Sequence, residues 1–108
     1  MIICTPVTSD GNIDPRWDRA DWIAIAEVIN GKIVNWQEID VLWSQLYYSG
    51  TFGSHDDRIV KFLREHRVEA VIANHVGDSM AQIFGTMRIS VHLGATGDAQ
   101  LAVKSITT

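Results

Sequence analysis

The sequence predicts an α/β fold of three layers, in which helices cover both faces of one mixed, five-stranded sheet. Three observations predict it. Two β-rich runs in the first half are joined by a tight-turn dipeptide. In the second half, apolar runs typical of buried strands alternate with helical segments of about ten residues, which requires parallel crossover connections. The chain of 108 residues is 46% hydrophobic, enough for one packed core, so we expect a single domain over residues 1–108.

Three strands are expected in the first half of the chain. The apolar run Met1–Val7, "MIICTPV", predicts a buried first strand that ends at a polar, turn-rich segment. The runs Trp22–Ile29 and Lys32–Ile39 flank Asn30-Gly31, whose residues tolerate the positive φ angles of a type I′ turn, so an antiparallel hairpin is predicted. The next segment, Asp40–Ser54, has no clear period and is expected to be a long excursion.

Helices and strands are expected to alternate from Ser54 onward. In "SHDDRIVKFLREHR" the apolar residues recur at helical spacing with charges opposite, which predicts a helix. The remaining predicted elements are a strand over Val68–His75, a helix over Asp78–Met87, a strand over Arg88–Leu93 and a helix over Ala99–Ile106. The resulting order, βββαβαβα, is that of ribonuclease H-like architectures.

Composition disfavours several classes of partner. The formal charge is −4, and the acidic excess lies in residues 1–54, which hold three basic and seven acidic residues. Because there is no basic stripe, nucleic acid is not an expected partner. The single cysteine, Cys4, cannot form an intramolecular disulfide and fits a reducing compartment. No segment approaches the roughly 20 apolar residues of a membrane span, so we expect a cytoplasmic protein with no membrane partner.

The sequence contains no motif for nucleotide binding or nucleophilic catalysis. Neither a Walker-type loop nor a Gly-x-Gly-x-x-Gly turn follows the first strand, and no serine lies in a Gly-x-Ser-x-Gly context. A two-metal nuclease on this architecture needs carboxylates on the first strand, where the chain has Cys4 and Thr5. We therefore expect no enzymatic activity.

Four stretches carry a likeness to a known family: "ICTPVTSDGNID" at Ile3–Asp14, "RWDRADWIAIAEVINGKIV" at Arg16–Val34, "VEAVIANHVGDSM" at Val68–Met80 and "RISVHLGATGDAQLAV" at Arg88–Val103. Together they resemble the dinitrogenase iron-molybdenum cofactor biosynthesis family, which includes NifX-like proteins and the orange protein. The resemblance implies a ribonuclease H-like fold and a non-catalytic accessory protein. It further implies that such a protein binds or carries an iron-sulfur or molybdenum-containing sulfide cluster, or its precursor, with cofactor-assembly proteins as further partners.

The chain departs from this family in one loop. Members commonly carry a His-Phe-Gly-Arg-Ala-like stretch, where this sequence reads Arg16-Trp17-Asp18-Arg19-Ala20. Arg19 and Ala20 are kept, whereas the histidine and glycine positions hold Arg16 and Asp18. The departure leaves an alternative function open: a protein-interaction or regulatory module that has kept the fold but lost cluster binding.

The cluster implied by the resemblance is anionic, so its site is expected to offer guanidinium groups, helix N-termini and an imidazole. Arg16 and Arg19 would supply the guanidinium groups; the alternative is that they balance neighbouring aspartates. His75 ends a strand predicted to reach the sheet's carboxyl edge, where α/β sheets bind ligands, and Gly77 and Asp78 open the next helix. We predict cluster contacts at these five residues, with His75 also a candidate metal ligand.

His55 is the second candidate metal ligand, because it lies beside the start of the first long helix; the alternative is a solvent-facing residue. His66, His92 and Cys4 are expected to have structural roles. Three interpretations are open for the aromatic residues, which are pocket lining, an association surface and packing of a long loop against the sheet. These residues are the four tryptophans within Trp17–Trp43 and, in the excursion, Tyr47, Tyr48 and Phe52. Packing is the one expected.

Overall fold

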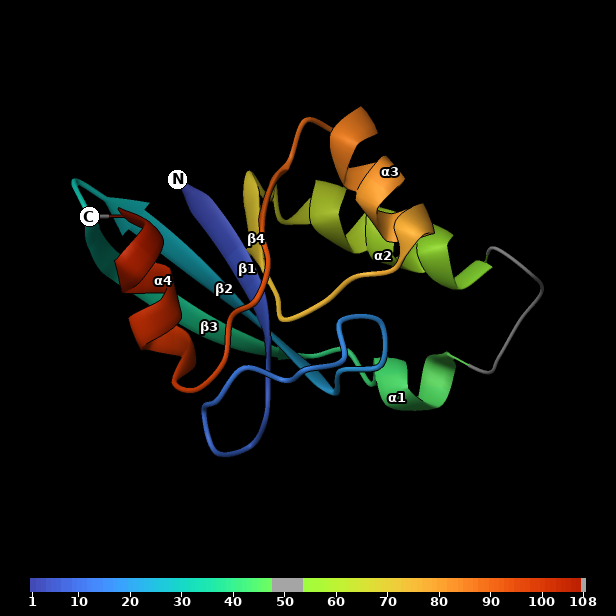
Figure 1. The fold of residues 1–108 in the computed structure, drawn as a ribbon, viewed down its shortest axis with the longest axis horizontal. Coiled ribbons are helices and arrows are strands. Elements are labelled where there is room, and N and C mark those ends of the chain that lie inside the picture. Colours follow the sequence, from blue (N-terminus) through green and yellow to red (C-terminus); the bar gives the residue numbers. More distant parts are fainter. Residues whose placement is uncertain (48–53, 108) are drawn as a thin grey trace.

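The computed structural model describes residues 1–47 and 54–107, which form a five-stranded sheet flanked by helices (Figure 1). The strands are Ile2–Val7 (β1), Trp22–Ile29 (β2), Lys32–Asp40 (β3), Ala70–Ile72 (β4) and Ser90–His92 (β5). Their order in the sheet is β3-β2-β1-β4-β5. β2 is antiparallel to both β1 and β3, whereas β4 is parallel to both β1 and β5. The predicted mixed sheet is therefore confirmed.

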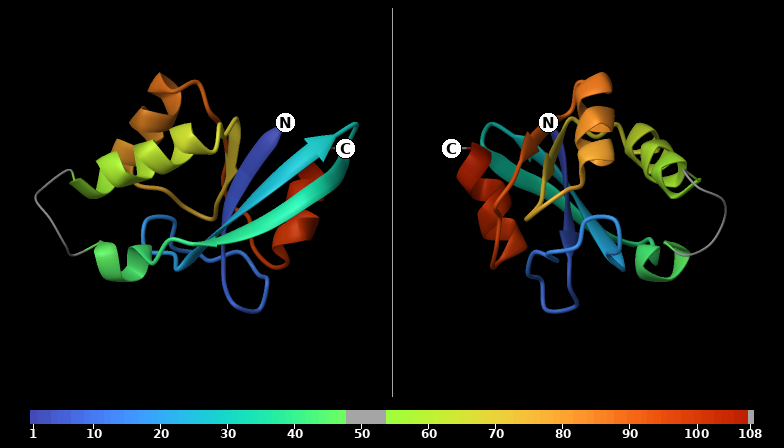
Figure 2. Two further views of the ribbon diagram at one scale, coloured as in Figure 1. Left: turned by 180° about the vertical axis from the view of Figure 1, so that it is seen from behind. Right: turned by 45° about the vertical axis from the view of Figure 1, so that its right-hand side comes forward.

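The described residues also form four helices, Trp43–Leu46 (α1), Ser54–Glu65 (α2), Asp78–Thr86 (α3) and Ala99–Thr107 (α4). α2 and α3 cover one face of the sheet and α4 covers the other (Figures 1 and 2). This arrangement confirms the predicted three layers. Within the described ranges, we find no helix with the length and apolar character needed to cross a membrane.

Alternation of side chains along the strands builds a separate core on each face of the sheet. Cys4 and Val71 belong to the core shared with α2 and α3, whereas their chain neighbours Ile3 and Ile72 belong to the core shared with α4. All four residues are at most 1% exposed. Because β1 and β4 are buried on both faces, their sequences are mostly apolar and do not alternate with exposed polar residues; Thr5 of β1 is polar but is itself fully buried.

The structure differs from the sequence prediction in two details. The excursion Asp40–Ser54 contains the one-turn helix α1, which is too short to give a recognisable helical period. Residues 48–53 of the excursion, which include Tyr48 and Phe52, lie outside the described residues. β4 and β5 are three residues each, shorter than the predicted runs Val68–His75 and Arg88–Leu93, because the flanking residues turn into the loops and helix ends.

The hairpin between β2 and β3 forms as predicted. Asn30 and Gly31 have φ angles of 52° and 77°, the left-handed values that a type I′ turn requires at both central positions. The turn therefore fixes the register in which Ile29 pairs with Lys32.

Gly31→Ala is expected to lower the free energy of unfolding by about 1 kcal/mol, because a Cβ atom disfavours the left-handed conformation. Urea denaturation followed by circular dichroism measures the change. The control is Gly85→Ala inside α3, where an added Cβ meets nothing within 4 Å and helix propensity favours alanine, so that variant should be more stable. Equal losses in the two variants would contradict the turn assignment.

Backbone hydrogen bonds join the loops at the carboxyl edge of the parallel strands. The N–H of Ile13, in the loop after β1, donates to the carbonyl of Gly97 at 2.7 Å. The N–H of Gly94, in the loop after β5, donates to the carbonyl of Asn74 at 3.0 Å. The segments that follow β1, β4 and β5 are thus tied to one another, and they form the base on which the candidate site stands.

Candidate functional site

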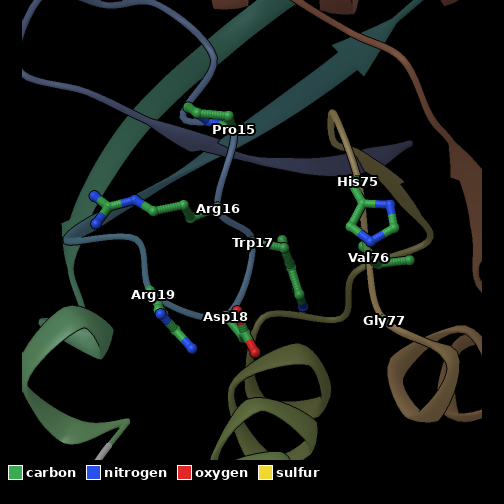
Figure 3. A pocket seen from close by; sticks show the side chains of 8 residues that line it. All are labelled: Pro15, Arg16, Trp17, Asp18, Arg19, His75, Val76 and Gly77. Atoms are coloured by element: carbon green, nitrogen blue, oxygen red, sulfur yellow. The ribbon is translucent and has the colours of Figure 1, made fainter.

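A cavity of about 210 Å³ opens at the carboxyl edge of β1 and β4 (Figure 3). β2 and β3 lie on one side of β1, and β4 and β5 lie on the other, so the strand order reverses at this point. Open α/β sheets bind ligands at such a reversal. Two segments line the cavity, Pro15–Arg19 from the loop after β1 and His75–Gly77 from the connection between β4 and α3. The structure thus brings together four predicted site residues, Arg16, Arg19, His75 and Gly77.

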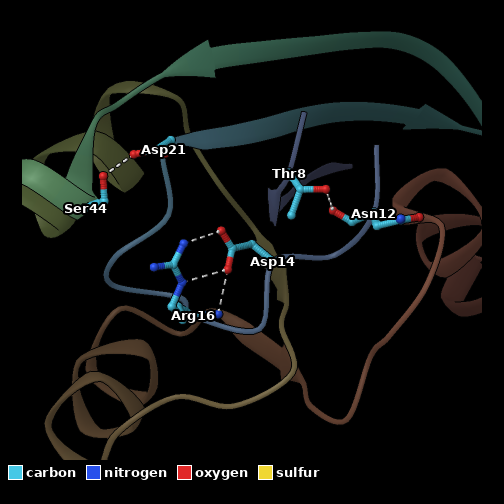
Figure 4. Close-up of polar contacts among 6 residues, drawn as sticks. All are labelled: Thr8, Asn12, Asp14, Arg16, Asp21 and Ser44. Atoms are coloured by element: carbon cyan, nitrogen blue, oxygen red, sulfur yellow. Dashed lines mark hydrogen bonds and ion pairs between the residues drawn. The ribbon is translucent and has the colours of Figure 1, made fainter. Parts of the chain in front are cut away.

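Arg16 forms a two-point ion pair with Asp14 beside the cavity (Figure 4). Its Nε and Nη2 lie 3.3 Å and 3.4 Å from the two carboxylate oxygens, and its backbone N–H donates to Oδ1 at 2.9 Å. The hydrogen bond to Asp14 and the charge of that residue raise the pKa of Arg16 above its ordinary value. The Arg16 side chain is 56% exposed, so this paired cation still has N–H groups open to solvent.

The guanidinium of Arg19 packs against the aromatic ring of Tyr47. Its Cζ lies 4.1 Å from the centroid of Tyr47, which directly follows α1, in a cation–π contact. Such a contact engages the face of the guanidinium and fixes its orientation. The helix α1, which the sequence did not predict, therefore helps to place one of the two arginines that line the cavity.

The opposite wall ends at the N-terminus of α3. Gly77 is the N-cap residue, in an extended conformation with φ −73° and ψ 168°, and among the described residues no side chain caps this helix. In α4, by contrast, the Asp98 carboxylate accepts the N–H of Leu101 at 2.9 Å. Helix α3 therefore presents first-turn N–H groups beside the cavity, and the exposed imidazole of His75 stands next to them (Figure 3).

Trp17 lies between the two walls, and the sequence singled it out only as one of a group of aromatics. It is 2% exposed and makes edge-to-face contacts with Trp43 and Phe84, with 5.5 Å between ring centroids in both cases. Its Nε1 is buried and has no hydrogen-bond partner in the described part of the chain. Trp17 thus joins the cavity to the core beneath α2 and α3, so the expected packing role holds for this residue and for Trp43.

His55, predicted as a metal ligand, does not line the cavity. The residue is 9% exposed, its Nε2 lies 2.6 Å from the carbonyl oxygen of Asp18, and its Nδ1 lies 2.7 Å from Nη1 of Arg58. Since both ring nitrogens are engaged, no lone pair is left for a metal. The solvent-facing alternative for His55 is therefore wrong, and in this structure the side chain contacts the protein through both ring nitrogens at a distance from the cavity lining.

Two further residues stand apart from the cavity. Asp78 is exposed in the first turn of α3, where its charge complements the helix dipole, and it does not line the cavity. Cys4 is fully buried in the core, and this burial raises the pKa of its thiol, which disfavours a thiolate ligand. Across residues 1–47 and 54–107, no three His, Cys, Asp or Glu side chains form a group that could hold a metal ion.

A comparison with known protein families shows to which family this chain belongs. A family model described as "Dinitrogenase iron-molybdenum cofactor" matches residues 1–108. The chain belongs to this family. The dinitrogenase iron-molybdenum cofactor family is thus the one that the sequence resembled, and that prediction is confirmed. None of the curated proteins matches the chain significantly.

Solved structures share the fold of this member of the dinitrogenase iron-molybdenum cofactor family. The crystal structure of PH0822 aligns with a TM-score of 0.80 at 19% identity, covering 99% of this chain and 88% of that one. The apo form of the orange protein from Desulfovibrio gigas aligns with a TM-score of 0.77 at 17% identity, covering 97% and 85%. A putative NifB protein from Thermotoga aligns with a TM-score of 0.71 at 21% identity, covering 98% and 86%. At these identities the likeness establishes the fold.

Proposed function

We propose that this member of the dinitrogenase iron-molybdenum cofactor family binds an anionic metal-sulfur cluster, or its precursor, and carries it without performing chemistry on it. One observation carries the proposal: the cavity sets two arginines on one wall against an uncapped helix N-terminus on the other. Guanidinium groups donate directed hydrogen bonds to anions, and first-turn N–H groups with the helix dipole favour negative charge. The family match and the fold shared with the orange protein support a cluster-related accessory role.

The proposed cargo is a preformed cluster of iron or molybdenum that brings its own sulfide ligands. The described residues offer no group of three metal-binding side chains, and the thiol of Cys4 is sealed in the core. Affinity would therefore rest on N–H donors that hold the sulfide edges of the cluster. His75 lines the cavity and is the proposed ligand for a metal at the surface of the cluster.

A carrier needs a route for loading and release. The proposed partners, besides the cluster, are cofactor-assembly proteins that deliver or receive it, and the proposed compartment is the cytoplasm, where a lone thiol stays reduced. The cavity suits transfer because His75 and Gly77 on one wall, and Arg16 on the other, are exposed to solvent.

The test is anaerobic loading. The protein is incubated with tetrathiomolybdate, or with ferrous iron and sulfide, then desalted and examined by metal analysis and visible absorption. We expect colour and metal to stay with the protein. The proposal fails if the protein emerges colourless and metal-free under conditions that load a known cluster-binding relative.

Gly77→Asp is expected to weaken tetrathiomolybdate binding without destabilising the fold. The new carboxylate would cap α3 and occupy its first-turn N–H groups, so the free energy of unfolding should stay the same or rise by about 0.3 kcal/mol. Tetrathiomolybdate retention should fall at least about tenfold, because the carboxylate competes with the cluster and repels it. Chemical denaturation and equilibrium titration measure the two effects.

The control for Gly77→Asp is Gly77→Ala, whose added Cβ meets nothing within 4 Å and carries no charge, so binding should change less. Equal binding by wild type and Gly77→Asp would remove the α3 N-terminus from the site.

The ion pair of Arg16 with Asp14 favours a second candidate function, an interaction or regulatory module that has lost cluster binding. The pair neutralises one of the two cavity arginines, and it occupies the loop in which the chain departs from the family pattern. A pull-down that yields a stable partner, undiminished by Arg16→Ala or His75→Ala, from a protein that does not load with clusters would favour this candidate.

A further inference from the structure

The structure assigns to His55 the role of a positioning residue, which holds the arginine-bearing wall of the cavity through the backbone of Asp18. The role deepens the proposed function, since that wall carries Arg16 and Arg19. His55 itself belongs to α2, and it follows Asp18 by 37 positions along the chain. The contact thus fastens the loop after β1 to a helix of the opposite half of the sequence.

The hydrogen-bond partners of His55 fix the tautomer of its ring. Nε2 lies 2.6 Å from the Asp18 carbonyl oxygen, which can only accept, so Nε2 carries the proton. Nδ1 lies 2.7 Å from Nη1 of Arg58, which can only donate, so Nδ1 holds the lone pair. Arg58 therefore selects the one neutral form of the imidazole that can donate to Asp18.

Arg58 is itself held in place by its position in α2 and by a hydrogen bond to the end of α1. It lies one helical turn after His55 in α2, and its Nη1 also donates to the carbonyl of Leu46 at 3.3 Å, at the end of α1. The guanidinium thus links the two helices that flank the wall. Arg58→Ala would remove the N–H donor of both contacts.

A second path leads from His55 to the same wall. Its ring lies 5.4 Å from that of Tyr47, and the guanidinium of Arg19 sits on Tyr47 at 4.1 Å. His55 therefore contacts both the backbone one residue before Arg19 and the ring on which the Arg19 side chain rests. Moving His55 would displace Arg19 from two directions.

Three variants separate the hydrogen bonds of His55 from its packing. His55→Phe keeps an aromatic ring against Trp43 and Tyr47 but removes both hydrogen bonds. His55→Gln keeps an N–H donor able to reach the Asp18 carbonyl. The matched control is His66→Phe, directly after the C-terminal end of α2, where the ring packs on Phe62 at 4.5 Å. Circular dichroism establishes that each variant is folded.

Two measurements need no ligand. Nitrogen-15 NMR of the wild type should find the His55 proton on Nε2 and none on Nδ1. Hydrogen exchange of the backbone amides in residues 16–20 should quicken about tenfold in His55→Phe, as expected for one lost hydrogen bond, and stay unchanged in His55→Gln and His66→Phe. A proton on Nδ1, or unchanged exchange in His55→Phe, overturns the positioning role.

The third measurement is the dissociation constant for tetrathiomolybdate. It should rise about tenfold in His55→Phe and stay near the wild-type value in His55→Gln and His66→Phe. If the wild type binds and His55→Phe binds equally well, the positioning role is overturned while the proposed function stands. If the wild type does not bind, the proposed function fails, and the tautomer and the exchange rates still decide whether His55 holds the loop.

Discussion

Replacing Arg16 and Arg19 together by methionine is expected to weaken tetrathiomolybdate binding about a hundredfold. Charge-assisted hydrogen bonds contribute about 1.5–3 kcal/mol each, and every 1.4 kcal/mol is a factor of ten in affinity. Each single change, Arg16→Met or Arg19→Met, should weaken binding less than the double change, because both side chains line the cavity. Equilibrium titration under nitrogen, followed by visible absorption, measures the affinities.

The matched control for this double variant is Arg88→Met. Arg88 is an exposed arginine between α3 and β5, at the amino edge of the sheet and therefore at the opposite end from the cavity. Its removal lowers the net charge without touching the proposed site. If Arg88→Met weakened binding as much as Arg19→Met, the anion would be responding to overall charge and the cavity would lose its role. Thermal unfolding of Arg16→Met checks that Asp14, 4% exposed, tolerates the loss of its partner.

Phe84→Ala is expected to lower the free energy of unfolding by about 3–5 kcal/mol, a large part of the stability of a domain this size. Phe84 is fully buried in the core beneath α2 and α3, and its ring lies 5.5 Å from that of Trp17. Truncation would leave an empty space in the core next to Trp17, which is one of the residues that line the candidate site. Urea denaturation measures the loss.

Phe62→Ala provides the comparison for Phe84→Ala. Phe62 is half-buried and packs against the same core from the edge, with its ring 5.5 Å from that of Trp43. Because its surroundings are open to solvent, the truncated site can refill with water, and the expected loss is clearly smaller. If the two variants lost similar amounts of unfolding free energy, Phe84 would not be packed in a closed core next to Trp17.

Local patterns in the sequence were sufficient to predict most of the fold. The Asn30-Gly31 turn and its flanking β-rich runs define the hairpin, and the two-face burial of β1 and β4 produces apolar runs that are recognisable without a structure. The sequence also predicted where the candidate site lies, from one topological rule: a parallel strand that ends near His75 places this residue at the carboxyl edge of the sheet, where the cavity is found.

The details of the site depend on contacts between residues far apart in the chain, which no local pattern encodes. His55 looks like an exposed flank in sequence because the groups that bury it, Asp18 and Tyr47, come from the loop after β1 and the end of α1. The role of Tyr47 under Arg19 was hidden in the same way. The aromatic residues between Trp17 and Tyr47 were the available signal, and they indicated packing without naming partners.

The two walls of the cavity come from segments that begin at Pro15 and His75, so the site exists only while the domain between them is folded. A cargo held there binds the native state alone. At a cargo concentration of a hundred times its dissociation constant, this linkage adds about 2.7 kcal/mol to the free energy of unfolding. Proteases that cleave transiently opened chains would then remove the empty protein faster than the loaded one. The lifetime of the protein in the cell would therefore increase with the concentration of the bound cargo.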